Sequence, residues 1–273
     1  MIKLIAIDMD GTLLNQKKEI SFKQKEALKE AEKKGIMTVL CTGRPLFGVI
    51  PFYKELELEK TNGYIIVNNG CSIHKTEDLS LTDYNKLAKK DIEYLYSLTE
   101  GYDVNFTLFD DKHYFCIGKP NEYTEYDGKL VYVPITEITL KEVLCDKYMM
   151  FQSMYVGSPE NVDKFQKDNQ ENLKKLYSIV RSQTYILEAM PFGVEKGSAV
   201  KRLSEKLGIK REEVMAIGDG NNDIEMLRYA EISVAMENGT EDVKKAAKYI
   251  TESNENDGVA KAIYKYALSQ PFL

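Results

Sequence analysis

Short runs of consecutive apolar residues recur in the first and last parts of the chain, and polar residues follow each of them. The runs span residues 4–7, 36–41, 64–67, 214–217 and 232–235. Continuous apolar runs of this length are typical of strands that are buried on both faces of a parallel sheet. Segments of helical composition separate the runs, so the pattern predicts an α/β fold with a doubly wound, mostly parallel sheet.

Helix signals lie between these predicted strands. Ser21 can cap a helix that continues to the residue before Gly35. Pro45 stands where the first turn of another helix can begin. Residues 196–207 have a helical composition and are followed directly by Gly208. The alternation of strand and helix therefore holds on both sides of the middle region.

The middle of the chain has a different pattern. Aromatic residues are more frequent within residues 83–189, and runs such as 103–108 and 148–156 alternate apolar with polar positions. Alternation of this kind predicts strands with one face toward solvent. A helix over residues 159–176 and a hairpin across residues 181–184 complete the pattern, which indicates an α+β domain.

The two patterns divide the chain into two predicted domains. Residues 1–82 and 190–273 form a core domain, and residues 83–189 form an α+β domain inserted into it. A length of 273 residues is sufficient for both. In the predicted core sheet, ligands are expected beyond the carboxyl ends of the parallel strands. Asp8, Thr42, Asn68 and Asp219 follow such strand ends, so we expect them to line one crevice.

Composition narrows the class of protein. Lys and Arg number 37 against 43 Asp and Glu, so the net charge of −6 does not favour a nucleic-acid-binding protein. The four cysteines lack the spacing of a zinc site, which favours reduced thiols. No apolar run approaches the ~20 residues that cross a bilayer, and the first apolar run is too short for a signal peptide. We therefore expect a cytoplasmic protein without a membrane or nucleic-acid partner.

Two carboxylates follow the first predicted strand in the sequence Asp8-Met9-Asp10-Gly11-Thr12. Residues i and i+2 of a strand share a face, so both carboxylates can point to one place. An ordinary surface turn is the alternative, because Asp-Gly is a common turn sequence. The D-x-D pair alone is a weak signal, whereas D-x-D-G-T after an apolar strand is far more specific.

More carboxylates follow a later predicted strand, in Gly218-Asp219-Gly220-Asn221-Asn222-Asp223. A turn with a helix cap at one of the two asparagines is the simpler interpretation. The dinucleotide fingerprint G-x-G-x-x-G does not fit, because Asp223 stands in place of the third glycine. Carboxylates that converge require a cation, and oxygen ligands alone favour Mg²⁺, which commonly binds substrate phosphate.

Two further elements suit phosphate binding. Thr42-Gly43-Arg44-Pro45 places a hydroxyl and backbone N–H groups between a strand and a helix, although the same residues suit an ordinary turn. Lys196 precedes Gly197-Ser198, but the flanking residues do not match a P-loop. Most lysines are solvated surface residues, so neither element identifies a site without the carboxylates.

Taken together, the four elements resemble the haloacid dehalogenase (HAD) superfamily of phosphohydrolases. They appear in its order, as DMDGT, TGR, a lone lysine and GDGNND, and the resemblance spans the whole chain. The inserted domain resembles the large α+β cap of class II, subclass B. The start IAIDMDGTLL, the turn at residues 68–70 and the segment 253–259 are similar to the Cof-type sugar-phosphatase branch.

The resemblance implies a role for each motif residue. Asp8 would be the nucleophile that forms an aspartyl-phosphate, and Asp10 the general acid and base, oriented by Thr12. Asp8, the Asp10 carbonyl and Asp219 would hold Mg²⁺. Asp223 would orient the metal waters or the lysine. The residues that would hold the phosphoryl oxygens are Met9 and Gly43 through their N–H groups, together with Thr42, Lys196 and Asn222.

The implied activity is hydrolysis of small phosphorylated metabolites, with sugar phosphates as the usual class for the family. The cap would close over the crevice and read the rest of the substrate. A phosphosugar mutase and a non-catalytic phosphometabolite-binding protein are the alternatives. Because Asp8 and Asp10 are both intact, the sequence argues against the binding protein. It does not indicate an oligomeric state.

Overall fold

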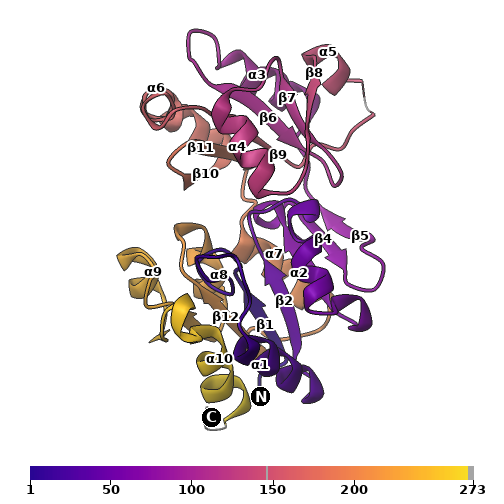
Figure 1. Cartoon of the computed structure of the whole chain (residues 1–273), viewed down its shortest axis with the longest axis vertical. Coiled ribbons are helices and arrows are strands. Elements are labelled where there is room, and N and C mark those ends of the chain that lie inside the picture. The colour runs from indigo at the N-terminus through magenta and orange to yellow at the C-terminus, as the bar shows by residue number, and fades with distance from the viewer. Residues whose placement is uncertain (146, 270–273) are drawn as a thin grey trace. The chain divides into compact units, whose positions relative to one another are not determined.

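The computed structural model describes residues 1–145 and 147–269 (Figure 1). Contacts within the chain divide it into two compact units. The core unit comprises Met1–Thr42, Tyr53–Asp83 and the described residues from Glu195 onward, and the inserted unit comprises Gly43–Phe52 and Tyr84–Val194. Residues 43–52 were assigned to the core domain from sequence, but they group with the inserted unit, where Phe47 packs against Phe109 with ring centroids 5.6 Å apart.

The core unit is built on one sheet with the strand order β14-β13-β12-β1-β2-β3-β4-β5. All pairs from β14 to β3 are parallel, and β4 is antiparallel to β3. The strands are β1 Leu4–Ile7, β2 Met37–Cys41, β3 Tyr64–Val67, β4 Ser72–Lys75, β5 Leu81–Tyr84, β12 Val214–Gly218, β13 Ile232–Ala235 and β14 Tyr249–Ile250.

Helices cover both faces of this sheet. Leu4 and Ala6 of β1 lie in one apolar cluster with residues of α7 (Lys196–Lys206) and α8 (Ile224–Tyr229). Ile5 and Ile7 alternate with them and are also fully buried, so the opposite face is covered as well. On the core unit, the further helices are α1 Phe22–Lys33, which packs against β2, α9 Glu241–Ala246 and α10 Gly258–Ala262. The predicted doubly wound α/β fold is therefore confirmed.

Helix α1 begins where the sequence predicted. The Ser21 hydroxyl accepts a hydrogen bond from the Gln24 N–H at 3.1 Å, and the Gln24 side chain accepts one from the Ser21 N–H at 3.1 Å. This reciprocal pair satisfies two N–H groups that the first helical turn would otherwise leave without partners. The helix predicted at Pro45 is instead a 3-10 turn, Leu46–Gly48, followed by α2, Ile50–Glu55.

The inserted unit contains a second sheet with the order β10-β11-β9-β6-β7-β8. Its strands are β6 Asn105–Phe109, β7 Tyr114–Ile117, β8 Ile135–Ile138, β9 Gln152–Val156, β10 Tyr177–Gln183 and β11 Ile186–Pro191. Its helices are α3 Lys89–Ser97, α4 Glu122–Leu130, α5 Leu140–Val143 and α6 Pro159–Leu176. The predicted helix over residues 159–176 is confirmed, and the hairpin turns two residues beyond the predicted position, at residues 184–185.

The alternating strands of this unit do not have a solvent face. Every residue of β9 is buried, and four of the five residues of β6 are buried. Phe106 and Tyr155 pack in one apolar cluster, whereas Phe109 and Met154 pack in another. The polar positions of the alternation are small residues such as Thr107 and Ser153, both fully buried. The predicted solvent face is therefore wrong for β6 and β9, because apolar clusters lie on both faces.

Candidate active site

The parallel register of the core sheet brings the first and the later acidic motifs together. Ile7 of β1 pairs with Ile217 of β12, and the Asp8 N–H donates to the Ile217 carbonyl at 3.0 Å. The residues that directly follow β1 and β12, Asp8 and Asp219, are therefore neighbours, although 211 positions separate them in the sequence. Asp8 is only 5% exposed.

Three carboxylates and one ammonium group form a compact cluster at these strand ends. Carboxylate oxygens of Asp8, Asp219 and Asp223 lie within 4.8 Å of one another. Lys196 Nζ, at the first residue of α7, donates to Asp8 Oδ1 at 2.6 Å and to Asp223 Oδ1 at 2.7 Å. The Lys196 side chain is 1% exposed, so this is a buried ion pair and not a solvated surface lysine. One positive charge faces three acidic groups.

The electrostatics of the cluster follow from its burial. Burial raises the pKa of the Asp8 carboxyl well above its ordinary value, and Asp223 adds to the rise while Lys196 opposes it. Burial likewise raises the pKa of Asp219, against the hydrogen bond from Thr12. Burial alone would lower the pKa of Lys196, but the carboxylates of Asp223 and Asp8 outweigh it and raise that pKa. The lysine is therefore charged, but its single positive charge does not balance three acidic groups.

Asp223 holds the cluster together through both of its oxygens. Oδ1 accepts from Lys196, and Oδ2 accepts from the N–H groups of Asp219 and Gly220, each at 2.9 Å. A Cβ at Gly218 would lie 2.5 Å from the Asp223 Cβ, so the close approach of the backbone at residue 218 to the Asp223 side chain requires glycine there. This arrangement fits the expected role of Asp223 in orienting the lysine.

Asp219 is held by the loop that follows β1. The Thr12 hydroxyl donates to Asp219 Oδ1 at 2.7 Å. Thr12 was expected to orient Asp10, and its hydroxyl donates to Asp219, which the β1–β12 register brings near. Gly11 has φ +85°, and a Cβ there would come within 2.8 Å of the Asp219 Cγ. Both residues therefore shape the space around the Asp219 carboxylate.

Asp10 is placed differently from Asp8. Its carboxylate accepts from Lys18 Nζ at 2.7 Å, and its side chain is 33% exposed. Its carboxylate is not a member of the three-aspartate group. The sequence proposal assigned the Asp10 carbonyl, and not its carboxylate, to the metal. The Asp10 carboxylate thus remains outside the metal ligands, as its expected role of general acid and base requires.

The remaining predicted residues occupy the strand ends nearby. Met9 is fully buried, and its carbonyl accepts from the N–H groups of Thr12 and Leu14. Thr42 is 1% exposed and follows β2 directly. Gly43 is the next residue in the chain and groups with the inserted unit.

An asparagine contact links the turn after β3 to the later acidic motif. Asn222 Nδ2 donates to Asn69 Oδ1 at 3.0 Å. Asn68 was expected at this crevice, but its Nδ2 donates to Ser72 Oγ at 3.1 Å, and Asn69 makes the link instead. Asn69 has φ 52°, the left-handed conformation that asparagine tolerates better than most residues. The pair Asn68-Asn69 before Gly70 was the only sequence signal for this contact.

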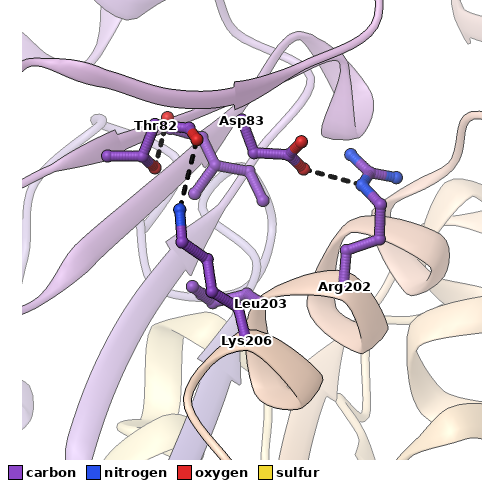
Figure 2. A pocket seen from close by; sticks show the side chains of 6 residues that line it. Thr82, Asp83, Arg202, Leu203 and Lys206 are labelled. Atoms are coloured by element: carbon purple, nitrogen blue, oxygen red, sulfur yellow. Dashed lines mark hydrogen bonds and ion pairs between the residues drawn. The ribbon is translucent and has the colours of Figure 1, made fainter.

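Helix α7, which carries Lys196, is also held to the turn and to β5. Arg202 donates to Asp83 Oδ2 at 2.7 Å, and Lys206 donates to the Thr82 carbonyl at 3.2 Å (Figure 2). Arg202 also donates to the Gly70 carbonyl at 3.1 Å. A Cβ at Gly70 would lie 2.9 Å from the Ala199 Cβ, so the turn packs closely on the helix. These contacts fix the helix that presents Lys196.

The donor set fits a hard divalent cation. Carboxylate oxygens are the ligands that such ions prefer, and the group contains no sulfur or nitrogen ligand among the described residues. Three acidic groups around one ammonium leave uncompensated negative charge in a buried place, which a cation would offset. The structure therefore supports a cation site at Asp8 and Asp219, with Asp223 committed to Lys196 and to backbone N–H groups.

The fold and the site define a class of protein, an α/β enzyme with a carboxylate and lysine cluster at the carboxyl ends of parallel strands. Residues 5–263 match the family model of haloacid dehalogenase-like hydrolases. The chain belongs to this family. The predicted family and the predicted enzyme class, a haloacid dehalogenase-type phosphatase, are confirmed.

Several relatives match over nearly their whole length. The protein YxeH of Bacillus subtilis is 35% identical over 271 residues, which cover 99% of this chain and all of that protein. A 5-amino-6-(5-phospho-D-ribitylamino)uracil phosphatase of Bacillus subtilis is 32% identical, covering 98% of this chain and 96% of its own. The solved structure of a subclass IIB sugar phosphatase superposes with a TM-score of 0.83 at 26% identity, covering 97% and 99%. No helix within the described residues is long and apolar enough to cross a membrane.

Proposed function

We propose that the chain is a Mg²⁺-dependent phosphomonoester hydrolase that acts through an aspartyl-phosphate on Asp8. The observation that carries the proposal is the buried Asp8–Lys196–Asp223 arrangement with Asp219 beside it. Lys196 donates to Asp8 Oδ1 and opposes the burial that raises the pKa of Asp8, so it favours the ionised, oriented carboxylate that a nucleophile requires. Phosphoryl transfer mainly requires positioning and charge stabilisation, and the cluster supplies both.

The proposed reaction has two steps. In the first, an Asp8 oxygen attacks phosphorus, the bond from phosphorus to the leaving oxygen breaks, and the Asp10 carboxyl gives its proton to that oxygen. In the second, water attacks phosphorus and gives a proton to the Asp10 carboxylate, while the bond between phosphorus and Asp8 breaks. Together, the two steps return Asp8 and Asp10 to their starting states. The products are inorganic phosphate and an alcohol.

Asp8, Asp219 and the Asp10 carbonyl would hold the cation, which would shield the charge between the anionic nucleophile and the anionic substrate. The Met9 and Gly43 N–H groups, Thr42, Lys196 and Asn222 would hold the phosphoryl oxygens. Thr12 supports Asp219 in this scheme, as its hydrogen bond indicates. Asp223 acts by holding Lys196.

Within this proposal, the inserted domain, residues 83–189 as predicted from sequence, serves as a cap that reads the rest of the substrate. We propose small phosphorylated metabolites as substrates, with sugar phosphates as the main class. Two relatives support this choice. One carries the name of a sugar phosphatase, and the other the name of a phosphatase whose substrate bears its phosphate on a ribityl chain.

The test measures phosphate release by the purified chain from an aryl phosphate and from a panel of sugar phosphates. We expect release with Mg²⁺, loss of release with EDTA, and recovery when Mg²⁺ is returned. Asp8→Asn should abolish turnover, whereas Asp242→Asn, an exposed aspartate on α9, should retain it. If folded protein with Mg²⁺ releases no phosphate from any member of the panel, the proposal fails. Conversion of a sugar phosphate into its isomer, dependent on a bisphosphate activator and without net phosphate release, would indicate the mutase.

A further inference from the structure

The loop that carries Asp10 is held by a distant part of the core unit. We call Asn238 together with the segment 253–257 the clasp. The segment lies between β14 and α10, and Asn238 lies after β13. The segment 253–259 was noted in the sequence for its resemblance to the Cof-type branch, yet the mechanism proposed above uses none of its residues.

Two asparagines of the clasp bind the loop on the carboxyl side of Asp10. Asn238 Nδ2 donates to the Gly11 carbonyl at 2.8 Å, and Asn254 Nδ2 donates to the Leu14 carbonyl at 2.8 Å. The two asparagines are also joined to each other, because the Asn254 N–H donates to Asn238 Oδ1 at 3.0 Å. They therefore act as one bracket on the residues one and four positions after Asp10.

The outer half of the loop meets the same segment. The Gln16 N–H donates to Glu255 Oε1 at 2.7 Å, and the Ser21 hydroxyl donates to Asp257 Oδ1 at 2.5 Å. Ser21 is the residue that caps α1. The clasp thus contacts the loop at four positions from Gly11 to Ser21, and Asp10 directly precedes the first of them.

The clasp is itself a rigid structure. The Gly258 N–H donates to the Ser253 carbonyl at 3.1 Å, and the Gly258 carbonyl accepts from the Thr251 hydroxyl at 2.8 Å. A Cβ at Gly258 would lie 2.8 Å from the Glu252 carbonyl carbon, so the chain is tightly folded there. Asp257 adopts the left-handed conformation, with φ 57°. A bracket built in this way can determine where the loop lies.

We propose that Asn238 and Asn254 are positioning residues that place Asp10 for proton transfer. The proposal rests on the proposed function and adds the groups that orient its acid. A general acid must lie within hydrogen-bond reach of the leaving oxygen. Asp10 is partly exposed and sits on a loop, so burial does not hold it as it holds Asp8. On the carboxyl side of Asp10, the loop is held by hydrogen bonds that include those to the Met9 carbonyl and those from the clasp.

A positioning role makes a specific kinetic prediction. An aryl phosphate has a good leaving group that departs without a proton, whereas an alkyl phosphate needs the acid. The ratio kcat/KM reports the step that forms the aspartyl-phosphate. Asn254→Ala at saturating Mg²⁺ should therefore lower kcat/KM about 10–100-fold for a sugar phosphate, a part of what general acid catalysis supplies. The loss for p-nitrophenyl phosphate should stay below about threefold.

The chain offers a matched control in the same turn. Asn256 is exposed, its side chain makes no hydrogen bond to any described residue, and it lies two residues from Asn254. Asn256→Ala should leave kcat/KM unchanged for both substrates. Asp10→Asn should show the same dependence on leaving group as Asn254→Ala, but more strongly. Thermal unfolding of each variant shows whether the fold is intact.

The outcomes separate the two hypotheses. If wild type is active and Asn254→Ala loses equal activity on both substrates, or matches Asn256→Ala, the positioning role is wrong while the proposed function stands. If wild type releases no phosphate from either substrate, the proposed function fails and takes the positioning role with it. If Asn254→Ala does not fold, Asn238→Ala, which removes the bond to Gly11, is judged by the same ratio.

Discussion

Asp8 and Asp10 are two residues apart, yet their surroundings differ in kind. The Asp8 side chain is 7% exposed and pairs with a lysine that is 1% exposed, whereas the Asp10 side chain is 33% exposed and pairs with a lysine that is 42% exposed. Strand β1 and its neighbours place Asp8, and side chains of a remote segment hold the loop of Asp10. These surroundings suit the two roles proposed above, since a nucleophile needs one fixed direction and an acid that serves two steps needs freedom within limits.

The largest expected effect comes from the buried side of this comparison. Lys196→Met leaves Asp8 and Asp223 without their shared cation, and loss of one partner of a buried ion pair costs about 3–5 kcal/mol. We expect a lower free energy of unfolding in urea and loss of phosphatase activity. Mg²⁺ should restore part of the stability by replacing the missing charge.

The matched control for that variant is Lys201→Met, on the same helix. The Lys201 side chain is 58% exposed, and its partner Glu205 lies 3.9 Å away. Its unfolding free energy should stay within about 1 kcal/mol of wild type. If both lysine variants unfold at the same urea concentration, Lys196 does not hold the cluster together.

The second effect tests how closely the Asp10 loop approaches the buried cluster. Gly11→Ala should lower kcat about 100-fold or more, because the new Cβ displaces the Asp219 carboxylate and small displacements at an active site are costly. Gly35→Ala is the control, since Gly35 has φ +75° and nothing within 4 Å of an added Cβ. It carries the same backbone strain without the clash. Equal kinetics in the two variants would contradict the proposed contact.

The third effect concerns the inserted unit, which has its own buried carboxylate. Burial raises the pKa of Asp127 to about 6, although the Tyr114 hydroxyl donates to it at 3.0 Å and opposes the shift. The folded state therefore binds this proton more tightly than the unfolded state. The stability that the protonated group contributes is present below pH 4 and is lost as the pH rises through about 6.

Asp127→Asn removes this dependence. Between pH 4 and pH 7, we expect wild type to lose up to about 3 kcal/mol of unfolding free energy relative to the variant, from two pKa units at about 1.4 kcal/mol each. Urea unfolding of both proteins at several pH values measures the difference. Parallel pH curves for the two proteins would show that Asp127 is not the source.

The smallest effect is expected on the exposed side of the comparison. Lys18→Met removes the partner of Asp10, but exposed ion pairs contribute only about 0–1 kcal/mol. The thermal midpoint should therefore match that of Lys17→Met, an exposed neighbour. The kcat for an aryl phosphate should change less than about threefold. A change as large as that of Lys196→Met would remove the distinction between the two carboxylates.

Local features of the fold were predictable because they depend on neighbours in the chain. Apolar runs marked β1, β3, β12 and β13, and Ser21 marked the start of α1. The candidate site was predictable to the same extent, since parallel strands bring their carboxyl ends to one edge. That rule, applied to Asp8 and Asp219, was enough to predict that both lie at the same edge of the sheet.

Other features required the path of the whole chain. Thr12 bonds Asp219 across 207 positions, and Asn254 bonds Leu14 across 240, and no periodicity reports pairings at such separations. The burial of both faces of β6 and β9 was missed because small polar residues alternate with large apolar ones both in a strand with one solvent face and in a strand buried on both faces. The grouping of residues 43–52 with the inserted unit was missed because it depends on a distant contact, in which Phe47 packs against Phe109.

By itself, the sequence determined the α/β class, the helix cap at Ser21 and which side chains can do chemistry, because periodicity and residue type are local properties. Tertiary structure decided the rest. It made Lys196 a buried partner of two aspartates and left Asp10 partly exposed on a loop held by asparagines. The physical reason is that burial sets the strength of a charge interaction, and burial is a property of the packed chain and not of any one segment.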